Sequence, residues 1–183
     1  MRGGKNLNPA NLLTLVRIVI IPIVVVLLLF PGKKESLAAG VLFLVAFLTD
    51  AIDGMIARRF EMVTDLGKLL DPLADKLLVS SSLIMLIPHG RVPAWIVAII
   101  VAREIGVTAL RGMASADGKV ISASSLGKVK TTLQAAGTFC LIVNYRYMGI
   151  DFHTAGMVLI VPALVLTAWS GVDYFVRYLR EVF

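Results

Sequence analysis

The strongest constraint on the fold is a series of long apolar runs separated by short polar breaks. Crossing a bilayer as a helix takes about 20 mostly apolar residues. The 183-residue chain is 58% hydrophobic with a mean hydropathy of +0.87, and it contains several such runs. The breaks carry turn residues, as in "PHGRVP" at 88–93. We therefore predict an all-α, polytopic membrane protein that forms a single domain over residues 1–183. Its six transmembrane helices are expected at residues 12–30, 37–58, 68–88, 93–113, 126–149 and 154–177.

Lysines and arginines predict the orientation of the chain, because they collect on the cytoplasmic side of a membrane. If the N-terminus is cytoplasmic, 14 of the 18 lie on or toward the inside, and Lys33, Lys34, Arg91 and Arg146 lie outside. We therefore expect both termini on the cytoplasmic side of the plasma (inner) membrane. A cleaved signal peptide is the alternative for the first 30 residues, but five more spans follow, which favours a retained helix. The net charge of +6 is explained by the positive-inside topology and by attraction to anionic lipid, so no nucleic-acid partner is expected.

Acidic residues are concentrated between two of the apolar runs. Half of the 12 aspartates and glutamates fall within residues 50–75, and ionisable groups inside membrane segments are functional by default. Asp50 and Asp53 are three residues apart and share one helix face, whereas Asp71 and Asp75 are four apart on the next helix. Because a short inner loop joins these helices, both acidic faces lie near the cytoplasmic end and can converge.

Four facing carboxylates repel one another at neutral pH unless cations neutralise them. Hard oxygen ligands suit magnesium, manganese or calcium, and a pair of such metals is the usual arrangement for phosphoryl chemistry. Two other interpretations stay open at this point. The aspartates can form an ion-pair network with nearby lysines and arginines, or they can line the cation or proton pathway of a transporter.

The spacing of these residues resembles the signature of the CDP-alcohol phosphatidyltransferases. The motif is Asp50-x-x-Asp53-Gly54-x-x-Ala57-Arg58, eight residues, then Gly67-x-x-x-Asp71-x-x-x-Asp75, and every position matches. "NLLTLVRIVIIP" at 11–22 is similar to the family's first helix. "AREIGVTALR" at 102–111, "GKVKTTLQ" at 127–134 and "SGVDYF" at 170–175 resemble the phosphatidylglycerophosphate synthase branch. The resemblance extends from about residue 6 to the end of the chain.

The resemblance implies transfer of a phosphatidyl group from CDP-diacylglycerol, a membrane lipid, to an alcohol, with release of CMP. It implies that Asp50, Asp53 and Asp71 hold two divalent cations, Mg²⁺ or Mn²⁺. Asp75 is then the general base for the acceptor hydroxyl and a further metal ligand. A homodimer is also implied. The expected pocket for the CDP moiety comprises Gly54, Ala57, Arg58 and Gly67, with Asn11 and Thr14 from the first helix.

Cations in the second half of the chain predict an acceptor that bears a phosphate. They are Arg103, Arg111, Lys128 and Lys130. The two arginines are eight residues apart and share roughly one helix face, whereas the lysines are two apart and do not. Positive-inside anchoring is the alternative role for all four. The set suits sn-glycerol 3-phosphate better than serine or choline.

Other functions remain open at this level. The same chemistry can serve inositol phosphate, or phosphatidylglycerol as in a cardiolipin synthase, and the branch resemblance alone ranks these acceptors below sn-glycerol 3-phosphate. The alternatives from other functional classes are a divalent-cation transporter and a catalytically silent lipid-binding scaffold. A transporter does not need the Ala57-Arg58 pair beside its acids, and a scaffold does not need the complete set of aspartates. Both features therefore favour an enzyme.

Overall fold

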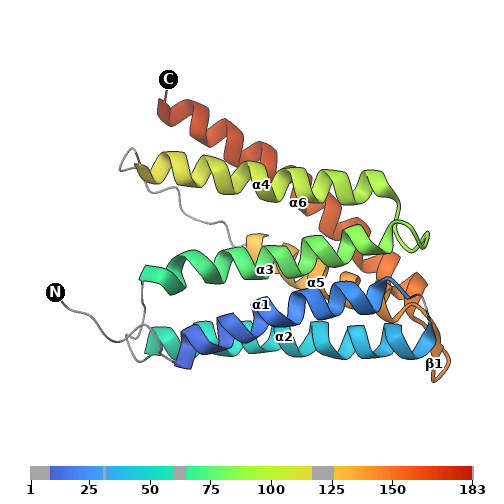
Figure 1. Ribbon diagram of the computed structural model, residues 1–183. Helices are drawn as coiled ribbons and strands as arrows, with labels where there is room; N and C mark the ends of the chain where they lie inside the picture. The colour runs from blue at the N-terminus through green and yellow to red at the C-terminus, as the bar shows by residue number, and fades with distance from the viewer. Residues whose placement is uncertain (1–8, 31, 60–64, 117–125, 183) are drawn as a thin grey trace. The chain divides into compact units, whose positions relative to one another are not determined.

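The computed structural model describes residues 9–30, 32–59, 65–116 and 126–182, and helices dominate it (Figure 1). The chain divides into two compact units, Met1–Leu86 and Ile87–Phe183. The first unit contains α1 (Pro9–Leu28), α2 (Lys33–Arg59) and α3 (Asp65–Leu86). The second contains α4 (Ala94–Ala116), α5 (Leu126–Val143), β1 (Arg146–Tyr147), β2 (Ile150–Asp151) and α6 (Phe152–Val182).

In the first unit, α1 packs against both α2 and α3. Val24 of α1, Phe43 of α2 and Leu83 of α3 are fully buried. Arg17 is also buried, at 2% exposure, and its Nε donates a hydrogen bond to the Ala46 carbonyl at 3.2 Å. An apolar core and a buried polar contact therefore hold α1 against α2, the helix that carries the first two aspartates of the acidic motif.

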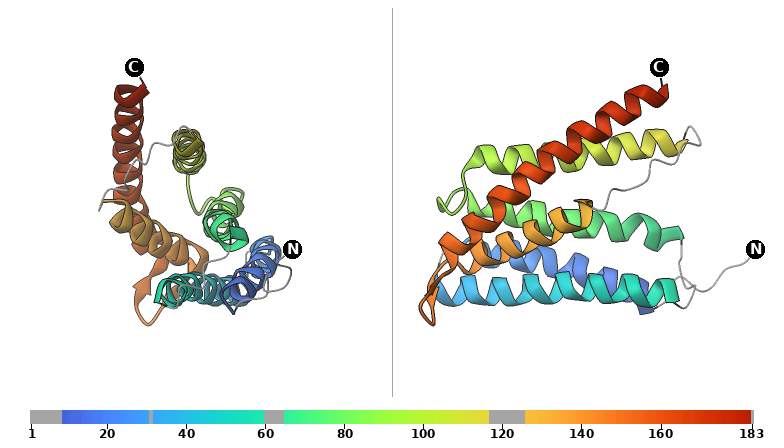
Figure 2. Two further views of the ribbon diagram at one scale, coloured as in Figure 1. Left: turned by 90° about the vertical axis from the view of Figure 1, so that its left-hand side faces the viewer. Right: turned by 180° about the vertical axis from the view of Figure 1, so that it is seen from behind.

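In the second unit, α6 packs along α5 and also contacts α4 (Figure 2). Glycines allow the close approach of α5 and α6. A Cβ added to Gly156 would lie 2.7 Å from the Leu141 Cγ, and one added to Gly137 would lie 3.1 Å from the Ile160 backbone nitrogen. Small residues at helix contacts let backbones approach closely and gain van der Waals contact in an apolar environment. The α5–α6 pair is thus tightly packed, and α4 packs against its α6 member.

A short hairpin joins α5 to α6. β1 and β2 pair antiparallel with Tyr147 opposite Ile150. The two residues between them, Met148 and Gly149, have φ values of 48° and 82°, which match the positive φ values that a type I′ hairpin turn requires. The expected fifth helix, 126–149, therefore extends too far, because its last residues form the hairpin.

The ends of the helices at this hairpin are capped. Asn144 follows α5 with a φ of 60°, a conformation typical of a helix C-terminus. The Asp151 Oδ1 accepts hydrogen bonds from the backbone N–H groups of His153 at 3.0 Å and Thr154 at 3.2 Å. These bonds, Thr154's foremost, hold the pKa of Asp151 below its ordinary value. The carboxylate thus acts as the N-cap of α6.

The fold is mostly helical, with six helices in the described part of the chain, which is consistent with the predicted all-α class. Within those residues, Phe152–Arg180 is long and apolar enough to cross a membrane. Leu15–Leu28, Lys76–Leu86 and Val129–Val143 are shorter apolar helical segments. The structure therefore supports a membrane-span candidate in α6, while the six spans and their orientation stay predictions.

Candidate active site

The four aspartates of the acidic motif lie on two consecutive helices that contact each other. Asp50 and Asp53 are in α2, and Asp71 and Asp75 are in α3. Because the backbone is helical at each position, the three- and four-residue spacings are same-face spacings, as the sequence predicted. Their side chains lie outside the described residues, so the convergence of the carboxylates stays a prediction. Carboxylates on neighbouring helices form a donor set that suits hard divalent cations.

The residues expected around the CDP moiety also lie in the helices of the first unit. Their side chains, and that of Lys128 in α5, are outside the described residues, so their roles stay predictions. They are Asn11 and Thr14 in α1, Gly54, Ala57 and Arg58 in α2, and Gly67 in α3.

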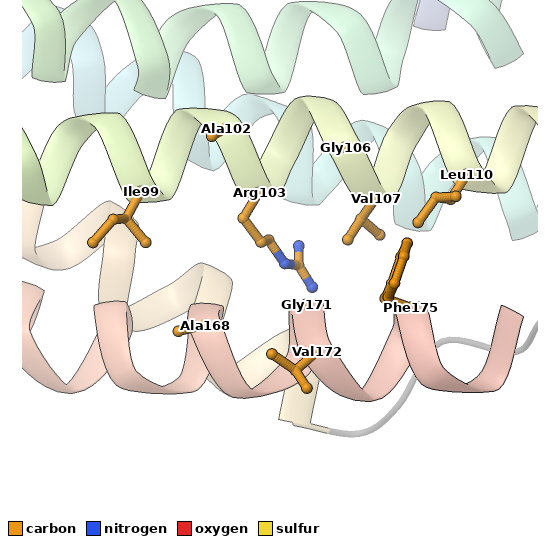
Figure 3. A pocket seen from close by; sticks show the side chains of 10 residues that line it. All are labelled: Ile99, Ala102, Arg103, Gly106, Val107, Leu110, Ala168, Gly171, Val172 and Phe175. Carbon is orange, nitrogen blue, oxygen red and sulfur yellow. The ribbon is translucent and has the colours of Figure 1, made fainter. Parts of the chain in front are cut away.

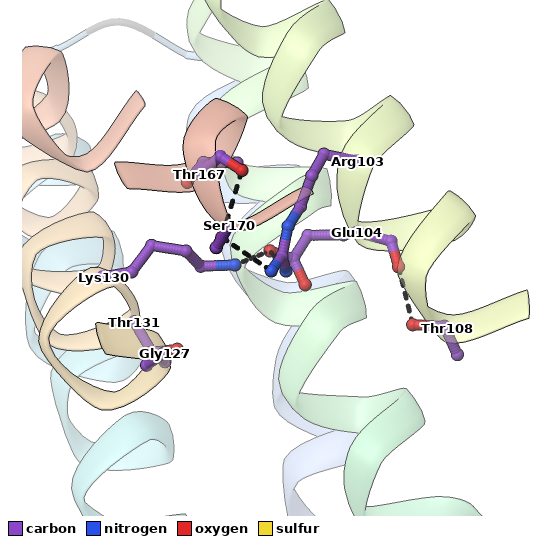
Figure 4. Close-up of polar contacts among 8 residues, drawn as sticks. All are labelled: Arg103, Glu104, Thr108, Gly127, Lys130, Thr131, Thr167 and Ser170. Atoms are coloured by element: carbon purple, nitrogen blue, oxygen red, sulfur yellow. Dashed lines mark hydrogen bonds and ion pairs between the residues drawn. The ribbon is translucent and has the colours of Figure 1, made fainter. Parts of the chain in front are cut away.

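Polar side chains from α4, α5 and α6 meet in the second unit (Figure 4). Nη1 of Arg103 donates to Oε1 of Glu104 at 3.2 Å, and Nζ of Lys130 donates to that same oxygen. Nη2 of Arg103 donates to Oγ of Ser170 at 2.8 Å, and this hydroxyl donates in turn to the Thr167 carbonyl at 3.1 Å. We call Arg103, Glu104, Lys130 and Ser170 the cation cluster. It unites two of the predicted acceptor residues, Arg103 and Lys130, that lie on different helices.

The charged side chains of the cation cluster are largely buried, which strengthens the electrostatic interactions among them. Lys130 is 4% exposed, and the side chains of Arg103 and Glu104 are 14% exposed. At an effective dielectric constant of ~20, opposite charges ~4 Å apart attract by ~4 kcal/mol, and desolvation of the ions offsets part of this. Since two cations face one carboxylate, these three side chains together retain a positive charge. That surplus suits an anionic ligand.

Arg111 lies further along α4 and also faces α6. Its guanidinium carbon is 5.4 Å from the centroid of the Tyr174 ring, within the range of a cation–π interaction. Arg103 also reaches α6, where it donates a hydrogen bond to Ser170. The expectation that the two arginines share a face of their helix is therefore confirmed. Unlike Arg103, Arg111 is exposed.

A cavity of about 500 Å³ lies between α4 and α6 (Figure 3). Arg103 is the charged residue in its lining, which is otherwise apolar side chains and glycines. A Cβ added to Gly171 would lie 3.0 Å from Cγ of Arg103, so this glycine leaves room for the arginine's stem. The other lining residues are Ile99, Ala102, Gly106, Val107, Leu110, Ala168, Val172 and Phe175.

Buried polar atoms near the cation cluster have unused hydrogen-bonding capacity. Within the described part of the chain, Arg103 Nε, Gln134 Oε1 and Thr167 Oγ1 are buried without a hydrogen-bond partner. Gln134 is one helical turn from Lys130, and Thr167 is one turn from Ser170. Leaving such groups unsatisfied costs about 1–3 kcal/mol each, and native proteins contain few of them. These atoms therefore have hydrogen-bonding capacity that a polar ligand or water can satisfy.

Sequence reasoning assigned no role to Ser170 or Gly171, and it left Glu104 either to orient a neighbouring base or only to pair with Arg103. Glu104 was visible as an acid beside Arg103 within an apolar helix, which is a usable signal. Ser170 and Gly171 carried no comparable signal, because their importance depends on which helix lies opposite Arg103. That neighbour is a tertiary feature that residue spacing does not encode.

Comparison with known proteins points to one family. The family model described as CDP-alcohol phosphatidyltransferase matches residues 7–169, which include the whole acidic motif together with Arg103, Glu104 and Lys130. A curated CDP-diacylglycerol–glycerol-3-phosphate 3-phosphatidyltransferase from Bacillus subtilis is 41% identical, over 92% of this chain and 93% of the relative. A probable phosphatidylglycerophosphate synthase from Mycobacterium tuberculosis is 41% identical, over 96% and 83% respectively. A CDP-diacylglycerol–glycerol-3-phosphate 3-phosphatidyltransferase from Escherichia coli K12 is 38% identical, over 91% and 92%.

Proposed function

The chain belongs to the CDP-alcohol phosphatidyltransferase family, and we propose that it transfers the phosphatidyl group of CDP-diacylglycerol to sn-glycerol 3-phosphate. The products are phosphatidylglycerophosphate and CMP. Two of the relatives carry a name that states this donor and this acceptor, and they align with more than nine-tenths of the chain. The transporter and scaffold alternatives lose their support, because the family is one of transferases.

The observation that carries the choice of acceptor is the pair of cations on the Glu104 carboxylate. Arg103 and Lys130 come from different helices, are largely buried, and leave a surplus of positive charge. Guanidinium groups bind phosphate through two hydrogen bonds at once. sn-Glycerol 3-phosphate carries such a phosphate, whereas serine and choline carry none. Arg111 and Lys128 are proposed as further contacts for the acceptor.

We assign two divalent cations, Mg²⁺ or Mn²⁺, to Asp50, Asp53 and Asp71, with Asp75 as an additional ligand. The four lie on helices that contact each other, and carboxylate oxygens are the ligands that these ions prefer. When bound, such ions neutralise charge on the diphosphate of the donor and on the departing CMP. Gly54, Ala57, Arg58 and Gly67, with Asn11 and Thr14, are proposed to surround the CDP moiety.

Asp75 is proposed as the general base. It accepts the proton of the acceptor hydroxyl as the oxygen forms a bond to the phosphorus of the phosphatidyl group. The bond between that phosphorus and the oxygen of CMP breaks, and CMP leaves with the electron pair. A positioned base contributes about 100- to 10,000-fold to such a step, and positioning and electrostatics supply most of the rest.

We propose that the whole chain, residues 1–183, is one enzymatic domain of the inner membrane with six spans. Both termini are then cytoplasmic, as the 14-to-4 distribution of lysines and arginines predicts. The active site faces the cytoplasm, so the acyl chains of the donor stay in lipid while the soluble acceptor arrives from water. A homodimer is part of the proposal on the strength of the family resemblance.

Acceptor choice is tested by CMP release from CDP-diacylglycerol in detergent with Mg²⁺. Parallel reactions contain sn-glycerol 3-phosphate, inositol phosphate, phosphatidylglycerol or serine as the candidate acceptor. We expect CMP release that depends on sn-glycerol 3-phosphate. Release with phosphatidylglycerol or inositol phosphate instead would reassign the acceptor within the family. An absence of CMP release with every acceptor would contradict the proposed reaction.

A further inference from the structure

We propose that Glu104 is a positioning residue for the acceptor. Its carboxylate holds the Arg103 guanidinium and the Lys130 ammonium together, so that both receive the acceptor's phosphate at once. This role rests on the proposed function, because it takes the phosphate of sn-glycerol 3-phosphate as the ligand. Glu104 itself touches the two cations and acts through them.

The geometry that points to this role is the sharing of one oxygen. Arg103 reaches Oε1 of Glu104 from the same helix, and Lys130 reaches that oxygen from α5 (Figure 4). Two donors within hydrogen-bonding distance of one oxygen are close neighbours, and a phosphate group offers several oxygens to such a pair. Glu104 therefore keeps two cations from different helices at a separation that one phosphate can bridge.

Charge and burial explain why a carboxylate is needed at this position. Without it, two cations that are at least 86% shielded from solvent would repel each other across a short distance. The flexible stem of Lys130 would then carry its ammonium toward the membrane interface. Binding a phosphate would require that side chain to be ordered again, which weakens affinity.

The remaining contacts of Arg103 support a cluster that binds a phosphate, as opposed to an ion pair whose hydrogen bonds are all satisfied. Ser170 holds Nη2 at 2.8 Å, and Gly171 gives the arginine stem its room. Nε of Arg103 is buried and has no hydrogen-bond partner in the described residues. Since the four side chains of the cluster sum to one positive charge and Nε of Arg103 is an unused donor, we expect a phosphate to add to the cluster without displacing Glu104.

The test is the Glu104→Gln variant of the full chain, which keeps the size of the side chain and removes its charge. We expect the KM for sn-glycerol 3-phosphate to rise about 10-fold, as loss of alignment of one charge-assisted hydrogen bond predicts. The KM for CDP-diacylglycerol and kcat should each change by less than about 2-fold, a split that general disruption of the fold would not produce. Glu104→Asp, which keeps the charge, should recover part of the loss.

The matched control is Asp173→Asn, the same chemical change on α6. The side chain of Asp173 is 42% exposed and pairs with Arg177 one turn away at 3.0 Å, and such surface pairs contribute little. Both KM values should stay at those of the wild-type chain.

A second variant keeps the test decisive if Glu104→Gln fails to fold. Glu104→Gln combined with Lys130→Gln removes one charge of each sign and leaves the net charge of the cluster unchanged. We expect this double variant to fold, with a KM for sn-glycerol 3-phosphate within about 3-fold of Lys130→Gln alone, because coupled residues are not additive. If instead the double variant raises this KM about 10-fold above that of Lys130→Gln alone, Glu104 does not act through Lys130.

A folded Glu104→Gln variant with an unchanged KM for sn-glycerol 3-phosphate would overturn the assignment. So would an equal rise in both KM values or a loss confined to kcat. Failure of the proposed function is visible separately in the wild-type chain, as an absence of CMP release with sn-glycerol 3-phosphate.

Discussion

Replacing Gly171 with alanine tests whether the position of Arg103 controls acceptor binding. The added Cβ would lie 3.0 Å from Cγ of Arg103, whereas carbon atoms prefer a separation of about 3.5–4.0 Å. The arginine stem must therefore move by at least ~0.5 Å to restore a normal contact. Its far end is held by Ser170 at 2.8 Å, and the same displacement would stretch this bond beyond the ordinary range.

The magnitude follows from that bond. A hydrogen bond to a charged group contributes about 1.5–3 kcal/mol, and losing about half of it corresponds to ~1 kcal/mol, or roughly a 5-fold rise in the KM for sn-glycerol 3-phosphate. Stability should change little, because the preference of a helix interior for alanine over glycine, about 1 kcal/mol, offsets the weakened hydrogen bond. We expect weaker acceptor binding in a protein that is no less stable.

The assay is the initial rate of CMP release against sn-glycerol 3-phosphate concentration at saturating CDP-diacylglycerol, with thermal unfolding followed in the same detergent. Gly106→Ala is the matched control, because Gly106 lines the same cavity and an added Cβ there meets nothing within 4 Å. Its KM should equal that of the wild-type chain. An unchanged KM in Gly171→Ala, or an equal rise in both alanine variants, would refute the link to Arg103.

Three further predictions concern the base, the second arginine and the topology. Asp75→Asn should keep CDP-diacylglycerol binding better than Asp50→Asn does, yet lose about 100- to 10,000-fold in kcat, because a base is absent while the other metal ligands remain; turnover within a few-fold of wild type would remove the base assignment. Arg111→Lys should raise the KM for sn-glycerol 3-phosphate and leave that for CDP-diacylglycerol nearly unchanged, since lysine lacks the fork of guanidinium. If neither KM moves, Arg111 is a topological anchor. In a background without native cysteine, a cysteine at Lys5 should be shielded from an impermeant label in intact cells, and one at Lys33 should react; labelling at Lys5 from outside would reverse the orientation.

The helices and the acidic motif were predictable because short-range patterns encode them. Apolar runs indicate six helices, and the spacing of Asp50 to Asp75 depends only on helical periodicity. The end of the fifth helix was predicted too late, because Tyr145, Tyr147 and Met148 extend an apolar pattern into the hairpin. Positive φ values at Asn144 and Met148 end that pattern, and hydropathy does not register backbone conformation.

The charged residues of the candidate acceptor site could be predicted from the sequence, whereas the contacts that bring them together could not. Arg103 and Lys130 were both expected to bind phosphate, and the structure brings them to one carboxylate. That Ser170 would hold the arginine could not be foreseen, since it depends on α6 crossing α4 at that level. Helix pairing of this kind depends on close contacts such as that of Gly171 with Arg103, which lie far apart in sequence.

The most direct test of the proposed reaction follows the acceptor into the lipid. Purified protein is given CDP-diacylglycerol, Mg²⁺ and radiolabelled sn-glycerol 3-phosphate, and both the CMP released and the label in the organic phase are measured. We expect equal amounts of CMP and lipid-bound label, with both products abolished by excess EDTA. CMP release without labelled lipid would make the protein a hydrolase, and equal turnover in EDTA would contradict the metal site.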